Sequence, residues 1–188
     1  TEFELLPLLS ERTGDELAAP PTALHAKDSK AGYNVTTPQQ AWVYWNTLQH
    51  QRTAGEVFEI AMEHARRAVE RAKARTGQDI DVISFAELKS KQAYSLPKQD
   101  ASLNFPEQSR LATRALIESL GITRPTVVMG FGSIPYSAVS LRDESLRATI
   151  SEAVQPFGLG LVNYFAGISD MSFFGEASGD LSVAASNT

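Results

Sequence analysis

The sequence predicts an α/β fold, in which helices pack on a mixed, ferredoxin-like sheet. The first reason is an alternation of segments in the order β, β, α, β, α, β, α, β. The second is a long amphipathic segment over residues 54–76 that has clear start and stop residues. The third is composition, because 43% hydrophobic residues with 21% charged residues suit a packed core in a chain of 188 residues.

The first elements carry the least regular patterns. Residues 3–9 are apolar enough for a strand, although Pro7 limits it to an edge or a bulge. Residues 10–32 combine glycine and proline with polar residues, so an irregular connection is expected there. Residues 41–48 are rich in aromatic and β-branched side chains on both faces, which predicts a strand in the centre of its sheet.

The long helix is predicted from local signals. Thr53 and Glu56 form a capping box at its start, and Gly77 follows its last turn. One apolar stripe should face the sheet: Val57, Phe58, Ala61, Met62, Ala65, Ala68, Val69 and Ala72. His64 flanks that stripe and is expected at the surface.

The remaining elements are shorter. A strand over 80–84 should lead into a helical turn from Phe85, and a second long helix should run from Pro106 to Gly121. A buried strand is expected over 126–131, and another strand over 159–165. Ser140 and Asp143 should cap a third helix that ends at Pro156 and turns four apolar side chains inward: Leu146, Ile150, Ala153 and Val154.

Composition excludes several kinds of site. The absence of cysteine rules out disulfides, thiolate metal sites and cysteine nucleophiles, and it is compatible with a cytoplasmic location. A net charge of −5 argues against a nucleic-acid interface. No apolar run approaches the roughly 20 residues of a membrane span. The chain starts at Thr1 and ends in small residues over 176–188, which suggests a flexible tail and a single domain cut from a longer protein.

The sequence also contains no recognisable set of residues for a complete catalytic site. His25 and Asp28 lie three residues apart in an expected loop, and no other histidine adds a ligand. The segment Gly130–Pro135 matches neither a serine elbow nor a dinucleotide-binding loop. We therefore expect no catalytic residue and no metal ligand within this segment.

Three polar residues are candidates for contact with a substrate or another subunit. His50 and Arg52 lie between a strand and a helix N-terminus, where a guanidinium can bind a carboxylate. The alternative is that Arg52 is a solvated joint residue and His50 a hydrogen-bonded one. Asp170 stands in an apolar run, where it either caps a turn through nearby serines or pairs with a cationic ligand or a neighbouring chain's arginine.

Five segments resemble the RocB-type arginine-utilisation proteins, a branch of the zinc peptidase family that includes the aminoacylases and carboxypeptidase G. The segments are Phe3–Pro7, Pro20–Thr22, Tyr33–His50, Arg52–Val57 and Ile168–Phe173. The resemblance implies the inserted lid, or dimerisation, domain of α/β sandwich type. The zinc ligands, His-x-Asp, Glu-Glu and a late His, would then belong to the parent's catalytic domain.

Two functions follow as expectations. The first is a non-catalytic lid and dimerisation domain of a metal-dependent peptidase or amidohydrolase linked to arginine metabolism. Its partners would be the parent catalytic domain, a second copy of the chain and a small amino-acid-like substrate. His50 and Arg52 would reach the active site, so both are expected to be partly exposed and to lack a strong partner within the chain. The second is a stand-alone small-molecule-binding or regulatory α/β module. Neither expects nucleic acid or a membrane as partner.

Overall fold

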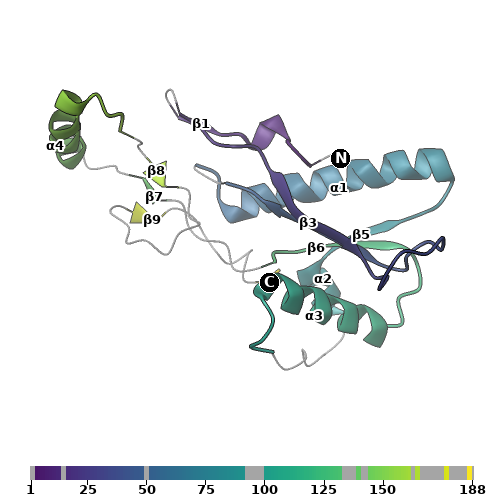
Figure 1. The fold of residues 1–188 in the computed structure, drawn as a ribbon. Coiled ribbons are helices and arrows are strands. Elements are labelled where there is room, and N and C mark those ends of the chain that lie inside the picture. The colour runs from purple at the N-terminus through teal and green to yellow at the C-terminus, as the bar shows by residue number, and fades with distance from the viewer. Residues whose placement is uncertain are drawn as a thin grey trace.

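The structure is a computed structural model, and it describes residues 3–13, 16–48, 51–91, 100–132, 139–140, 144–161, 164–165, 176–177 and 186–187. Helices and strands both occur in it, which confirms the predicted α/β class (Figure 1). The helices are α1 (Ala54–Thr76), α2 (Phe85–Ser90), α3 (Phe105–Ser119) and α4 (Glu144–Val154), with 3-10 turns η1 (Pro7–Leu9) and η2 (Gln155–Phe157). The strands are β1 (Arg12–Thr13), β2 (Glu16–Leu17), β3 (Thr22–Asp28), β4 (Ala41–Asn46), β5 (Asp81–Ser84), β6 (Thr126–Met129), β7 (Val139–Ser140), β8 (Tyr164–Phe165) and β9 (Glu176–Ala177).

The described strands are divided among four small sheets, and the expected single ferredoxin-like sheet is not formed by them. β1 pairs with β2 and β3 with β4, both antiparallel, while β5 and β6 are parallel and β7 lies between β8 and β9. The mixture of parallel and antiparallel pairs agrees with the sequence. Its division into separate sheets could not be predicted, because strand pairing depends on contacts between distant residues.

The main core lies where the parallel pair meets its connecting helices. Two parallel strands need a crossover between them, and here α2 and α3 supply it. The side chains of Phe85, Leu88 and Leu116 are almost fully buried there, with Ile83 and Val128 of the strands packed against them. α1 lies on the opposite side of the β5–β6 pair from α2 and α3 (Figure 1).

Helix α1 confirms the local signals of the sequence. Both halves of the Thr53–Glu56 capping box are present, and Gly77 ends the helix in a left-handed conformation with φ of 71°. The inward face includes Val57, Phe58, Ala61, Met62 and Val69, whereas Ala65, Ala68 and Ala72 are half-buried. The ring of Phe58 stacks on Phe131, just beyond β6, at 5.3 Å between centroids.

His64 is buried, and its expected surface position is wrong. Only 8% of the residue is exposed. It follows Ala61 by three residues and Val57 by seven, so helical spacing places it on the inward face of α1. The polarity of the imidazole suggested the surface, but the geometry of the helix determines which side it faces.

The N-terminal segment differs from its predicted form. Residues 3–9 do not form a strand: Leu5 has a φ of 55°, and Pro7 starts the 3-10 turn η1. Residues 10–32, expected to be irregular, contain β1, β2 and β3. β4 is a strand as predicted, but among the described strands it pairs with β3 alone and is not central.

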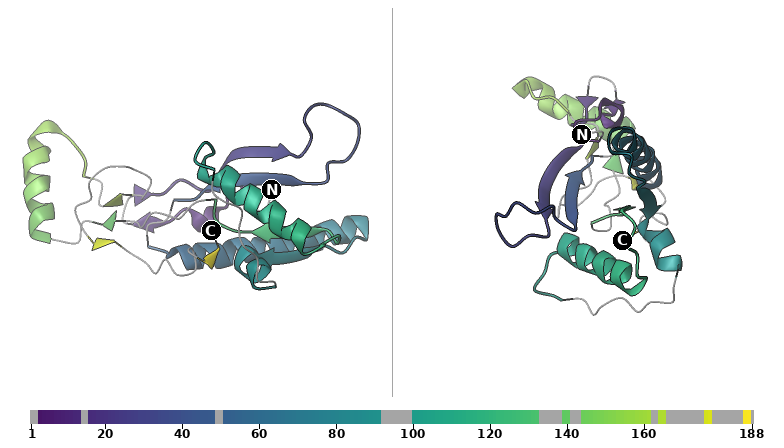
Figure 2. Two further views of the ribbon diagram at one scale, coloured as in Figure 1. Left: turned by 90° about the horizontal axis from the view of Figure 1, so that it is seen from below. Right: turned by 90° about the vertical axis from the view of Figure 1, so that its right-hand side faces the viewer.

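Helix α4 in the C-terminal half differs from its predicted form in its burial. Helix α4 is present, yet none of its residues is buried, so its apolar stripe is not turned into a core. Figures 1 and 2 show α4 lying away from α1, α2 and α3. The expected cap Asp143 lies outside the described residues, and Ser140 belongs to β7.

The last strand and the C-terminal tail also differ from their predicted forms. Of the strand expected over 159–165, the described part contains β8 at its end only. The expected tail over 176–188 includes β9, and near its end Asn187 is buried: its backbone O accepts a 2.8 Å hydrogen bond from Phe131 N, and its Oδ1 accepts a 3.0 Å bond from Ala86 N.

The packing of α1 can be tested with matched substitutions on the same helix. Ala61→Asp should lower the free energy of unfolding by about 3 kcal/mol or more, because it buries a charge without a partner. Ala74→Asp, at an exposed position of α1, should change it by about 1 kcal/mol at most. Urea denaturation measures both values. Equal losses for the two variants would contradict the assignment of the inward face.

The two capping boxes predict a dependence of stability on acidity. The backbone N–H and then the hydroxyl of Thr53 lower the pKa of Glu56, and those of Ser84 lower the pKa of Glu87. A carboxylate whose pKa is lower in the folded state stabilises the fold above its unfolded pKa of about 4.3, and this contribution is lost as the pH falls through the folded value.

The melting temperature should therefore fall as the pH drops from about 5 to 3, and the double variant Glu56→Gln, Glu87→Gln should show a shallower fall. Glutamine keeps an acceptor for the capping box but does not titrate. Thermal unfolding followed by circular dichroism measures the slope. Identical slopes for the two proteins would show that the capping carboxylates are not responsible.

Candidate functional site

Arg52 lies in the joint between β4 and α1, where a buried acid holds the backbone. The carboxylate of Glu11, a residue only 7% exposed, accepts hydrogen bonds from the backbone N–H of Gln51 and from that of Arg52, the latter at 3.2 Å. Its Oε1 also lies 3.7 Å from Nη1 of Arg52. Glu11 therefore fixes the path of the backbone into α1 and also lies beside the guanidinium of Arg52.

The N-terminal segment brings Glu11 to this joint. Leu9 anchors η1 with 1% exposure, and Ala18 N, beyond the short β1–β2 hairpin, donates to the Glu11 backbone O at 2.8 Å. A second acid anchors the same segment on the other side. Glu4 Oε2 accepts from Ala23 N at 2.8 Å and from the Trp45 indole N–H at 2.9 Å.

Sequence reasoning missed both acids, although a signal existed. Glu4 stands in the apolar run Phe3–Leu9, and an acid in apolar surroundings needs hydrogen-bond partners when it is buried. The rule that points to Asp170 points to Glu4 as well, whereas Glu11 stands between Ser10 and Arg12 and has no such local signal. Their partners lie between 19 and 41 residues away, so only the structure identifies them.

Arg52 agrees with one expectation and contradicts another. Its side chain is 31% exposed, as a residue that contacts a ligand should be. The expected lack of an internal partner is wrong, because the buried Glu11 carboxylate lies beside its guanidinium. At 3.7 Å this is an ion pair rather than a hydrogen bond, and a guanidinium has five N–H donors. The exposed part of the side chain can therefore still donate to an anion.

The N-terminus of α1 is less available to an external anion than the sequence suggested. Thr53 N donates to Glu56 Oε2 at 2.7 Å, and Glu56 N donates to Thr53 Oγ1 at 3.2 Å. Gln51 N and Arg52 N donate to Glu11. These backbone donors are thus used by the chain's own acids and its cap, so anion binding here would depend on the Arg52 side chain.

The other candidates are not brought into this joint by the described structure. His50 and Asp170 lie outside the described residues. His25 is exposed on β3 and stacks on Tyr44 with 6.1 Å between ring centroids. Within the described part of the chain, no three His, Cys, Asp or Glu side chains are grouped so that they could hold a metal ion.

The face of β4 opposite Trp45 packs on the start of α3. The Tyr44 hydroxyl donates to the backbone O of Pro106 at 2.9 Å, and the guanidinium of Arg110 lies 4.3 Å from the ring centre of Trp42. Burial is the main cause that raises the pKa of Tyr44, and the neighbouring Glu107 carboxylate adds to it. These contacts fix β4, and with it the position from which the joint starts. No helix of the described structure has the length and apolar character that crossing a membrane requires.

Comparison with known proteins finds two relatives in Bacillus subtilis strain 168. The protein YqjN, which is uncharacterized, is 28% identical over 198 residues, an alignment that covers 87% of this chain and 36% of YqjN. The protein RocB is 36% identical over 55 residues, or 29% of this chain and 10% of RocB. The chain thus spans about a third of the length of YqjN. No protein-family model and no solved structure matches it.

The role of Glu11 predicts an order of stabilities. Glu11→Ala should lower the free energy of unfolding by about 2–4 kcal/mol, because it leaves two backbone N–H groups of the joint without their acceptor. Arg52→Ala should cost about 1 kcal/mol, since Glu11 keeps both backbone donors. Glu59→Ala, on the exposed face of α1, should stay within about 0.5 kcal/mol. A loss for Arg52→Ala as large as that for Glu11→Ala would contradict this order.

Proposed function

We propose that this chain is a non-catalytic lid and dimerisation domain of a metal-dependent peptidase or amidohydrolase of the RocB-related kind. The observation that carries the proposal is the similarity to RocB, at 36% identity over 55 residues. The relation to YqjN supports it, because a chain that covers 36% of a relative has the size of one part of such a protein. Arginine metabolism is the setting that the resemblance to RocB-type proteins implies.

In this proposal the chemistry belongs to the rest of the parent protein. The zinc would be bound in the parent's catalytic domain, and this chain would supply side chains that contact substrate or a second subunit. Arg52 is the candidate of this kind that the structure describes, and His50 and Asp170 remain candidates. A substrate carboxylate fits a guanidinium that is partly exposed and paired with Glu11 through Nη1.

A second candidate function is a stand-alone small-molecule-binding or regulatory module. Its candidate ligand site is an open surface hollow of about 440 Å³ beside α4. Its lining is Ser151, Glu152, Val154, Gln155, Gly158, Leu159 and Leu161. The length of the parent reading frame separates the two functions. His-x-Asp and Glu-Glu motifs in the same frame support the lid, and a frame limited to these residues supports the module.

Arg52→Ala in the full-length parent tests the lid directly. The substitution should lower kcat/KM for hydrolysis by roughly 30- to 900-fold, which corresponds to about 2–4 kcal/mol of transition-state binding by one charged group. Arg75→Ala, at an exposed position of the last turn of α1, is the matched control and should leave kcat/KM unchanged. Equal activity of the Arg52→Ala variant and the unsubstituted parent would remove Arg52 from the site.

A further inference from the structure

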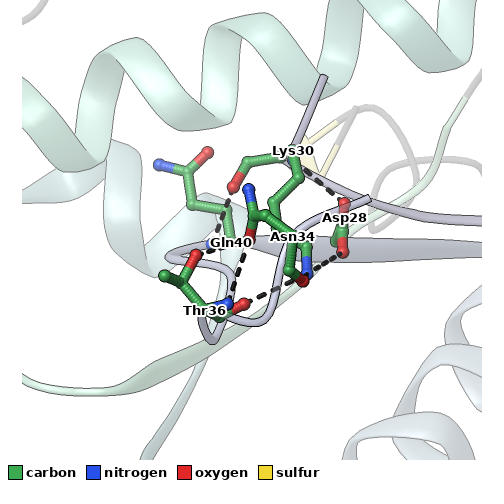
Figure 3. A network of polar contacts seen from close by, with 6 residues as sticks. Asp28, Lys30, Asn34, Thr36 and Gln40 are labelled. Atoms are coloured by element: carbon green, nitrogen blue, oxygen red, sulfur yellow. Dashed lines mark hydrogen bonds and ion pairs between the residues drawn. The ribbon is translucent and has the colours of Figure 1, made fainter. Parts of the chain in front are cut away.

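The loop between β3 and β4 is held in one shape by the side chain of Lys30 (Figure 3). The ammonium group donates to the backbone O of Asn34 at 3.2 Å and to that of Thr36 at 3.1 Å. It also lies 3.8 Å from the carboxylate of Asp28, which accepts the backbone N–H of Lys30 at 2.9 Å. The charge of Lys30 thus points inward to the loop and organises its backbone.

A second set of bonds fixes the tip and the base of the same loop. Asn34 Oδ1 accepts from Thr36 N at 3.0 Å and from the Thr36 hydroxyl at 2.6 Å. At the base, Ser29 N donates to the Gln40 backbone O at 2.9 Å, which continues the β3–β4 ladder. Because these internal bonds already fix the loop, it would lose little conformational entropy when it binds a partner.

The fixed loop displays two large side chains to solvent. Tyr33 is 97% exposed and Val35 is 92% exposed, on either side of Asn34. Residues 31–40 contain no charged side chain. An exposed aromatic residue on a preorganised, uncharged loop is typical of an anchor that fills an apolar pocket in a partner protein.

We propose that residues 31–37, with Tyr33 and Val35 as anchors, dock into an apolar pocket on the part of the parent polypeptide outside these 188 residues. This inference rests on the proposed lid function, and it names the segment that makes the contact. The similarity to YqjN indicates where such a pocket would lie, because about two-thirds of that relative is outside the matched region.

The absence of cysteine from the chain allows a direct test. Val35→Cys is labelled with a maleimide in the isolated chain and in the full-length parent, and the labelling rate of its peptide is measured by mass spectrometry. The docked loop should be labelled at least tenfold more slowly in the parent than in the isolated chain. Glu70→Cys, on the exposed face of α1, is the matched control and should differ by less than twofold.

A second variant tests the role of the loop's shape. Lys30→Met removes the bonds of the Lys30 ammonium group and leaves the Tyr33 anchor in place, so when it is combined with Val35→Cys it should reduce the protection seen for Val35→Cys alone in the parent. Equal labelling rates in parent and isolated chain would overturn the proposal. Protection in the isolated chain that grows with its concentration would also overturn it, because a second copy would then cover the loop. A reading frame limited to these residues would do the same.

The outcome is separable from that of the lid proposal. If Arg52→Ala impairs hydrolysis while Val35→Cys stays fully reactive in the parent, the lid stands and the docking loop fails. If the loop is protected while the parent hydrolyses no amide substrate, the docking contact stands and the proposed function fails.

Discussion

The buried carboxylate of Glu11 is the constraint on which the arrangement of the N-terminal half depends. A carboxylate removed from water needs hydrogen-bond donors, and Glu11 finds them in the backbone of the β4–α1 joint. The joint in turn needs an acceptor, because backbone N–H groups before a helix have no partner within it. The carboxylate and the joint satisfy each other, so the path of residues 3–13 and the start of α1 are fixed together.

The β3–β4 pair shows why such anchors are needed. A two-stranded ribbon is marginally stable by itself in water. Glu4 ties it to the N-terminal segment through Ala23 and Trp45, and the rings of Trp45 and Phe3 form a T-shaped pair with 5.3 Å between centroids. The opposite face is tied to α3 through Tyr44. The ribbon is therefore held from both sides by hydrogen bonds as well as by contacts between rings.

What the sequence predicts well is what neighbouring residues determine. The capping box of Thr53, the stop at Gly77 and the bounds of α1 need only a few adjacent positions, and all were predictable. The Glu11–Arg52 pair joins residues 41 positions apart, so no local pattern shows it. The place of Arg52 between a strand and the N-terminus of a helix was predictable from the capping box that follows it. Its anchoring by Glu11 was not.

The contrast between α1 and α4 shows what a helical pattern specifies. Both have an apolar stripe, but the stripe of α1 packs beside β5 and that of α4 is not buried. A helix of 11 residues is marginal without tertiary packing. An apolar stripe in the sequence therefore identifies which face of a helix should pack, but it does not identify the element that packs against that face. For α4, as for Tyr33 and Val35, exposed apolar groups stand on ordered backbone. In the proposed lid, the rest of the parent protein would cover these exposed groups.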